Sequence, residues 1–192
     1  MKLLWNWVKK IKTSYLLLLL PIAVIFNQWS TAVLNDWYRR SQFPVTYVQG
    51  QLSFSAAKLT MYYRHMLEQN SLPIYFQTQL IDFMFILSTM LLHGTLGLLF
   101  YKLLANRPFL KRLSSVGLIT GLLAPCFDIL ENIVSFYFIA NPEGIPQVLA
   151  LVYSSFSACK FGLFVITYLL FGFLLLCGLW VAILYFRKRN IK

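Results

Sequence analysis

Four long apolar stretches constrain the fold of this chain more than any other feature of its sequence. They cover about residues 14–34, 80–104, 113–139 and 161–186. A helix needs roughly 20 apolar residues to cross the hydrocarbon core of a bilayer, and each stretch reaches that length. None has the alternating apolar and polar pattern of a membrane barrel strand. The sequence therefore predicts an all-α, polytopic membrane protein built as a bundle of four transmembrane helices.

The composition indicates a single membrane domain over residues 1–192. Only 12% of the residues are charged and 59% are hydrophobic, whereas a soluble domain averages about 25% charged residues. The net charge of +11 is explained mainly by membrane topology and by attraction to anionic lipid head groups. We therefore expect membrane lipid, and not nucleic acid, to be the partner of this positive charge.

The distribution of Lys and Arg predicts how the chain is oriented. Basic clusters precede the first span, separate the second from the third and follow the last, whereas the loop at about 141–146 has none. Cytoplasmic segments carry an excess of Lys and Arg. We therefore expect a multi-pass protein of the inner (cytoplasmic) membrane with both termini in the cytoplasm. The first span is predicted to be an uncleaved signal anchor, because its apolar run is long for a signal peptide.

The loop at residues 36–79, between the first two spans, is then predicted to face outward. Within it, residues 53–69 predict an amphipathic helix, because apolar side chains recur at helical spacing: Leu59, Tyr62, Tyr63, Met66 and Leu67. Two interpretations are open. The helix packs on the outer surface as a lid or spacer, or it covers a substrate cavity with Arg64 and His65 as substrate-binding residues near the mouth.

Polar residues interrupt the third span. Asp128, Glu131 and Asn132 are spaced i, i+3 and i+4 and so share one helix face. Ionisable groups inside a membrane are costly and indicate a functional site by default. Counted from the cytoplasmic ends of their spans, Asp82 and Lys160 fall at nearly the same depth. These five side chains are predicted to converge in the outer half of the membrane.

Such a cluster allows several chemistries. Glu131 and Asp128 are the candidate catalytic acid and base, because two carboxylates in a low-dielectric pocket can hold different protonation states. Asn132, Asp82 and Lys160 are candidate substrate-binding residues. Carboxylates can instead hold a divalent cation, but no His lies on the motif face, and we predict no metal site and no cofactor. The structural alternative is a network in which Glu131 pairs with Lys160 and neighbouring helices are bridged.

The remaining motifs indicate packing. The three cysteines show no C-x-x-C spacing and are typical of small apolar packing residues. Gly94 and Gly97 in the second span, and Gly117 and Gly121 in the third, are predicted to allow close helix contacts. The sequence contains no glycine-rich phosphate loop, no G-x-S-x-G and no H-E-x-x-H.

Spans two and three together carry the pattern Asp82-x-x-Phe85 followed by Phe127-Asp128-x-x-Glu131-Asn132. This pattern resembles one in a family of bacterial four-span membrane proteins. The resemblance covers roughly residues 52–137 and implies a four-helix architecture in the inner membrane, with no activity to carry over. A more distant similarity, at the level of the fold, is to four-helix membrane sterol isomerases, which use carboxylates in a lipid-accessible cavity.

Three functions are compatible with the sequence, and it leaves open whether the protein is an enzyme. The leading hypothesis is that it binds or modifies a lipid or other hydrophobic substrate through the intramembrane carboxylates. The second is a non-enzymatic small subunit or assembly factor, whose polar cluster holds its own helices, a membrane-protein partner or a homo-oligomer in register. The third is a component of proton-coupled transport, for which four spans are few unless the chain oligomerises.

Overall fold

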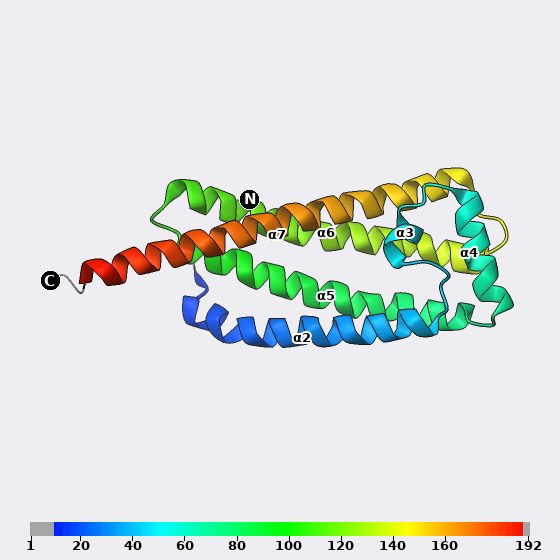
Figure 1. The fold of residues 1–192 in the computed structure, drawn as a ribbon, viewed down its shortest axis with the longest axis horizontal. Helices are drawn as coiled ribbons and strands as arrows, with labels where there is room; N and C mark the ends of the chain where they lie inside the picture. The colour runs from blue at the N-terminus through cyan, green and yellow to red at the C-terminus, as the bar shows by residue number, and fades with distance from the viewer. Residues whose placement is uncertain (1–9, 190–192) are drawn as a thin grey trace.

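The computed structural model describes residues 10–189. All the secondary-structure elements in this range are helices, and it contains no strand. The helices are α2 (Thr13–Arg40), α3 (Tyr47–Gln51), α4 (Ala56–Glu68), α5 (Leu72–Leu103), α6 (Pro108–Ala140) and α7 (Gln147–Arg189). In Figure 1 the long helices α2, α5, α6 and α7 run alongside one another, with α3 and α4 at one end. Among the described residues, four helices are long and apolar enough to cross a membrane. This confirms the predicted four-helix bundle and fits a multi-pass membrane protein.

The helices extend beyond the predicted spans. The second begins at Leu72 rather than near residue 80, with Pro73 in its first turn, where the missing backbone N–H would be unpaired in any case. The fourth is one helix of 43 residues, Gln147–Arg189, and therefore about 65 Å long at 1.5 Å per residue. That is twice the roughly 30 Å thickness of the hydrocarbon core. The predicted spans cover most of each helix, and the additional residues lie mainly at the end of α2 and at the starts of α5 and α7.

The bundle has two distinct ends, visible in Figure 1. At one end, which we call the loop end, α3 and α4 lie over the helices. At the other end, which we call the basic end, α2 begins, α7 finishes and residues 104–107 join α5 to α6. Lys2, Lys9 and Lys192, which belong to the predicted cytoplasmic clusters, lie outside the described residues.

The long helices pack in chain order. α2 packs against α5, α5 against α6 and α6 against α7, and α5 also touches α7. Within residues 10–189, α2 and α7 hardly touch. The side of the bundle between these two helices is therefore not closed by helix packing.

Small polar groups join α2 to α5. The Asn27 amide donates hydrogen bonds to the hydroxyls of Ser88 and Thr89, at 3.1 and 3.0 Å. The hydroxyls of Ser30 and Ser88 lie 2.7 Å apart. Such interhelical contacts are common in membranes, where apolar burial does not drive helices together.

Glycines allow close contact at three of the four predicted positions. A Cβ added at Gly97 would lie 2.8 Å from Leu118 Cβ and 2.9 Å from its Cα, and Gly117 and Gly121 are similarly crowded. A Cβ added at Gly94 would meet only Leu122 Cδ2, at an ordinary 3.7 Å.

This difference predicts opposite outcomes for two alanine substitutions on one helix. We expect Gly97→Ala to destabilise the protein by about 1–3 kcal/mol, because overpacking at the Leu118 backbone forces α5 and α6 apart. Gly94→Ala should be neutral or slightly stabilising, because alanine is the better helix former. Thermal denaturation of the two purified variants in detergent measures the effect. Equal melting temperatures would contradict the close contact at Gly97.

The helix predicted in the outward loop is α4, and its apolar face is buried: Leu59, Tyr62, Tyr63 and Met66. This face packs against residues from the loop ends of three long helices. We call the group formed by Phe43, Tyr63, Tyr75, Phe138 and Tyr153 the aromatic cap. The first turns of α7 thus pack against the loop helix α4.

Hydrogen bonds hold the loop on α7. The Gln147 side chain accepts from the backbone N–H of Ala56 at 2.9 Å and donates to the carbonyl of Phe54 at 3.0 Å. The Phe54 N–H donates to the Ser154 hydroxyl at 3.0 Å. In the cap, the Tyr63 and Ser135 hydroxyls are 2.9 Å apart. Burial raises the pKa of the Tyr63 hydroxyl well above its usual value, so this residue remains neutral.

Candidate functional site

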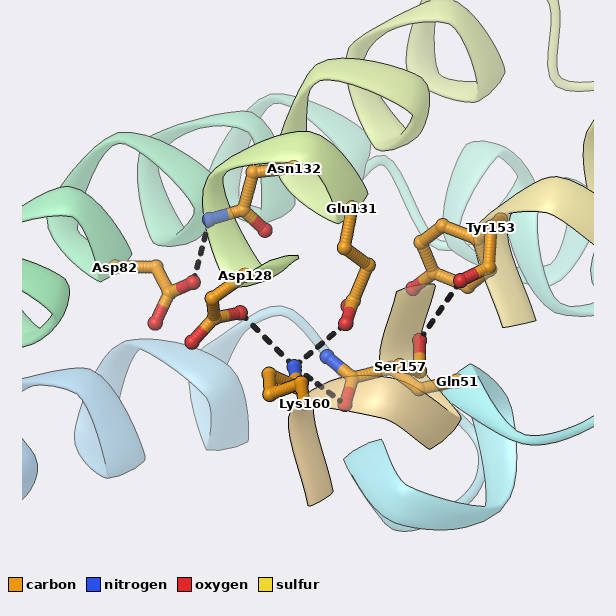
Figure 2. Close-up of polar contacts among 8 residues, drawn as sticks. All are labelled: Gln51, Asp82, Asp128, Glu131, Asn132, Tyr153, Ser157 and Lys160. Atoms are coloured by element: carbon orange, nitrogen blue, oxygen red, sulfur yellow. Dashed lines mark hydrogen bonds and ion pairs between the residues drawn. The ribbon is translucent and has the colours of Figure 1, made fainter. Parts of the chain in front are cut away.

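The five polar side chains of the predicted cluster lie together, and they come from three helices (Figure 2): Asp82 on α5, Asp128, Glu131 and Asn132 on α6, and Lys160 on α7. Each residue is at most 8% exposed. The three α6 residues share a face because they lie one helical turn apart. That face points toward α5 and α7, the two helices that supply the partners.

Lys160 is the centre of one part of the cluster. Its Nζ lies 2.6 Å from Glu131 Oε2 and 2.9 Å from Asp128 Oδ1. It also donates to Gln51 Oε1 on α3, at 3.2 Å. A lysine ammonium has three donors, and three acceptors surround it here. Sequence analysis did not identify Gln51, which reaches the cluster from the loop.

Asp82 belongs to a second part of the cluster. Its Oδ2 accepts a hydrogen bond from Asn132 Nδ2 at 2.5 Å. Among the described residues, no Lys, Arg or His forms an ion pair with Asp82. Asn132 Oδ1 is buried without a hydrogen-bond partner. This part of the site therefore has more acceptors than donors.

All three helices place the cluster at one level. At 1.5 Å per residue, Asp82, Asp128 and Lys160 lie roughly 15–20 Å along the helix axes from the loop ends of α5, α6 and α7. Each lies within a helix that is long and apolar enough to cross a membrane. The charges are therefore surrounded by apolar helix on both sides.

A cavity of about 350 Å³ lies beside the cluster. Asp82, Asp128 and Lys160 line it, together with apolar and aromatic side chains from both α2 and α7. It therefore lies on the side of the bundle where these two helices hardly touch. Ligand sites typically have volumes of about 300–1,000 Å³ and few polar groups. The described residues lining the cavity do not include Glu131, which lies beside Lys160 and is 1% exposed.

Arg64 and His65 do not join this cavity. They line a separate depression on the surface of α4, with Glu68. The helix turns its Tyr63 face toward the bundle, so Arg64 is exposed and His65 half-buried on its other sides. The interpretation that placed these two residues near the mouth of the cavity is therefore wrong, and the lid or packing interpretation describes α4 better.

His93 is buried away from the charges. Its Nδ1 lies 3.1 Å from the carbonyl oxygen of Gly121, so that nitrogen donates and Nε2 carries the lone pair. The imidazole ring packs against Phe164, Tyr168 and Phe171. Phe164 and Tyr168 also line the cavity, which places His93 behind the cavity wall.

The arrangement suits charge pairing better than metal binding. Among residues 10–189, no group of three His, Cys, Asp or Glu side chains is placed to hold a metal ion. The Lys160 ammonium already lies between Asp128 and Glu131. A divalent cation between these carboxylates would be repelled by that charge at short range.

The cluster also carries more negative than positive groups. It contains the carboxyl groups of Asp82, Asp128 and Glu131 but one ammonium, that of Lys160. Unpaired charge in a low-dielectric site is unfavourable. A proton or a positively charged ligand group is therefore required, and Asp82 is the carboxyl group with no cation beside it among the described residues.

Comparison of the chain with protein-family models, with curated proteins and with solved structures found no match. The resemblance to bacterial four-span membrane proteins therefore stays a prediction.

Proposed function

We propose that this protein binds a lipid or another amphiphile in the cavity between α2 and α7 and either holds it or modifies it there. The cavity itself is the observation that carries this proposal. It has about 350 Å³ of space at the level of the apolar helices, with three charged side chains in largely apolar and aromatic walls. An apolar pocket with a few polar groups is the usual form of a small-molecule site.

The route of entry favours a substrate that comes from the bilayer. At the loop end, the aromatic cap and α3 cover the bundle. Between α2 and α7, by contrast, little helix packing blocks the way. A membrane-dissolved molecule can therefore reach Asp82 sideways, with its polar end toward the charges and its apolar end toward the lipid.

Asp82 is the best candidate for a group that acts on the ligand. It lines the cavity and has one partner, the Asn132 amide. Asp128 also lines the cavity, but it is paired with Lys160. Glu131, which the sequence placed first as acid or base, is better suited to position Lys160, because it does not line the cavity.

The orientation belongs to the same proposal. The described lysines and arginines at the basic end include Lys10, Lys12, Arg107 and Lys111. At the loop end the described chain carries fewer: Arg39 and Arg40, which both pair with Asp36 at 2.6 Å, and Lys58 and Arg64 on α4. This asymmetry supports an inner-membrane protein with both termini in the cytoplasm.

A cavity-filling substitution tests the function. Thr31 of α2 lines the cavity, whereas Ile25 of the same helix is 69% exposed and faces away from the bundle. We expect Thr31→Trp to lose a lipid that wild type and Ile25→Trp retain, because the indole fills the space that the lipid needs. Native mass spectrometry of protein released from mild detergent, with extraction of the bound lipids, measures this. Equal lipid retention in all three proteins would reject the cavity as a binding site.

One observation favours the second candidate, a subunit or assembly factor. The Glu131–Lys160 ion pair and the Asn132–Asp82 hydrogen bond bridge α5, α6 and α7, which explains much of the cluster without any substrate. Lipid analysis of a deletion strain complemented with wild type or Asp82→Asn separates the two functions. A lipid change rescued only by wild type supports lipid handling. Unchanged lipids, with a membrane protein that co-purifies with wild type, support the subunit.

A further inference from the structure

We infer that the polar end of the cavity is built for a positively charged head group that donates hydrogen bonds, so that the ligand is an amphiphile with an ammonium head. This inference rests on the proposed function and names the class of ligand. It depends on two buried acceptor atoms without donors, on the charge of the cluster and on the aromatic walls.

Two buried acceptor atoms at the polar end of the cavity have no hydrogen-bond donor. Gln79 lines the cavity, is 5% exposed, and its Oε1 is buried without a hydrogen-bond partner. Asp82 lies one turn further along α5, so the two side chains share a helix face. Asn132 Oδ1, next to Asp82, is also unpaired. Buried polar atoms are nearly always hydrogen-bonded, so two neighbouring acceptors without donors, beside a carboxylate with a single donor, indicate a ligand that supplies them.

The second observation is that Asp82 has no positively charged partner among the described residues. Lys160 donates hydrogen bonds to Asp128 and Gln51 and forms an ion pair with Glu131, whereas no ion pair between Lys160 and Asp82 is present. Within the described chain, Lys160 is the only basic residue that lines the cavity. An ammonium group beside Asp82 supplies both the missing positive charge and donors for the carboxylate and for Gln79.

Other head groups fit less well. A phosphate or carboxylate would be repelled by the three carboxyl groups, which outnumber the one ammonium group of the cluster. A hydroxyl donates one hydrogen bond and leaves the charge uncompensated. A proton on Asp82 compensates the charge and supplies one O–H donor, which satisfies only one of the two unpaired oxygens, Gln79 Oε1 and Asn132 Oδ1. Aromatic rings near the acidic groups favour a cation further, because their faces attract positive charge: Tyr38, Phe85 and Phe164 line the same cavity.

The rest of the cavity suits an alkyl or similarly apolar tail. Leu34 of α2 and Val165 of α7 line its two walls. A head group at Asp82 places the tail between these walls, toward the side where α2 and α7 do not pack together. We therefore expect the ligand to enter from the bilayer with its head group first, so that its tail remains directed toward the lipid.

Three probes with the same tail test the head group: dodecylammonium, dodecanol and dodecanoate. They are titrated onto the full chain in nanodiscs of zwitterionic lipid, which removes general attraction of the cation to anionic lipid. We expect dodecylammonium to bind about tenfold more tightly than the other two, because charge-assisted hydrogen bonds are roughly twice as strong as neutral ones. Asp82→Asn should abolish this preference, while its amide oxygen can still accept from Asn132.

Two further variants keep the test decisive. Gln79→Leu leaves every ion pair in place and should weaken dodecylammonium binding more than dodecanol binding. Glu68→Gln, an acidic residue on the outer surface of α4, should change neither. If all three probes bind equally and Thr31→Trp blocks them, the cavity binds amphiphiles and the ammonium inference is overturned. If no probe binding responds to Thr31→Trp, the proposed function falls together with the inference.

Discussion

Replacement of Lys160 by Met is expected to destabilise the protein by about 3–5 kcal/mol. The ammonium lies 2.6 Å from Glu131 and 2.9 Å from Asp128, and these side chains are at most 5% exposed. Removing one partner of a buried ion pair leaves uncompensated charge in a medium that solvates it poorly, and losses of this size are typical. Thermal unfolding in nanodiscs, followed by intrinsic fluorescence, should show a much lower melting temperature than wild type.

The loss should be recovered when the charges are removed together. The variant Lys160→Met with Asp128→Asn and Glu131→Gln has no buried charge at this position and should regain most of the stability, because a buried ion pair contributes little net stability over neutral groups of similar size. Lys58→Met, at an exposed position on α4, is the matched control and should have little effect. A Lys160→Met protein as stable as wild type would mean that both carboxyl groups are already neutral.

Tyr63→Ala is expected to cost about as much, roughly 3–5 kcal/mol, for a different reason. The ring is 0% exposed, and its centroid lies 5.5 Å from that of Tyr75 and 5.7 Å from that of Phe138. Truncation leaves a cavity in the centre of the aromatic cap, where three long helices and α4 meet. Thermal unfolding of the purified variant in detergent measures the loss.

Two controls separate packing from other effects of Tyr63. Tyr63→Phe keeps the ring and loses the contact with the Ser135 hydroxyl, so a loss of about 1 kcal/mol is expected. Met61→Ala changes a residue of the same helix that is 59% exposed and should alter stability by less than about 0.5 kcal/mol. Similar losses in Tyr63→Ala and Tyr63→Phe would show that the hydroxyl, and not the ring, stabilises the cap.

Both predictions depend on features that the sequence revealed to different degrees. The four spans could be predicted because crossing a membrane requires a minimum apolar length of roughly 20 residues in every helix. The meeting of Asp82, Asp128 and Lys160 could be predicted for the same reason, since counting residues from the helix ends gives the depth of each. The i, i+3 and i+4 spacing of the α6 motif then fixed the shared face.

The contact between Gln51 and Lys160 could not be predicted by counting residues along the helices. The sequence Thr46-x-x-Gln49 contains the pattern of a capping box, and Thr46 and Gln49 do form one at the start of α3. The pattern predicts where the helix begins but not where it lies. Its position over Lys160 depends on contacts between α3 and α7 that are distant in sequence.

The division of roles within the cluster was also hidden. Asp82 lines the cavity while Glu131 does not, although both are acidic residues in apolar helices. Which acidic side chain lines the cavity depends on the positions of α2 and α7 relative to α5 and α6. No local sequence pattern predicts these positions. Arg64 and His65 were misplaced for a similar reason, because the rotation of α4 is set by the packing of its Tyr63 face.

The attachment of α2 has a consequence for motion. Ion pairs and a hydrogen bond hold α5, α6 and α7 together through the cluster, whereas α2 supplies none of those contacts within the described chain. It is fixed to α5 by small groups such as Asn27 and Ser30 and, at the loop end, by Tyr38 against Tyr75. α2 can therefore shift relative to α7 without breaking an ion pair of the cluster. Different contacts therefore determine access to the cavity and the stability of the bundle. A change in access need not lower the stability, and a change in stability need not alter the access.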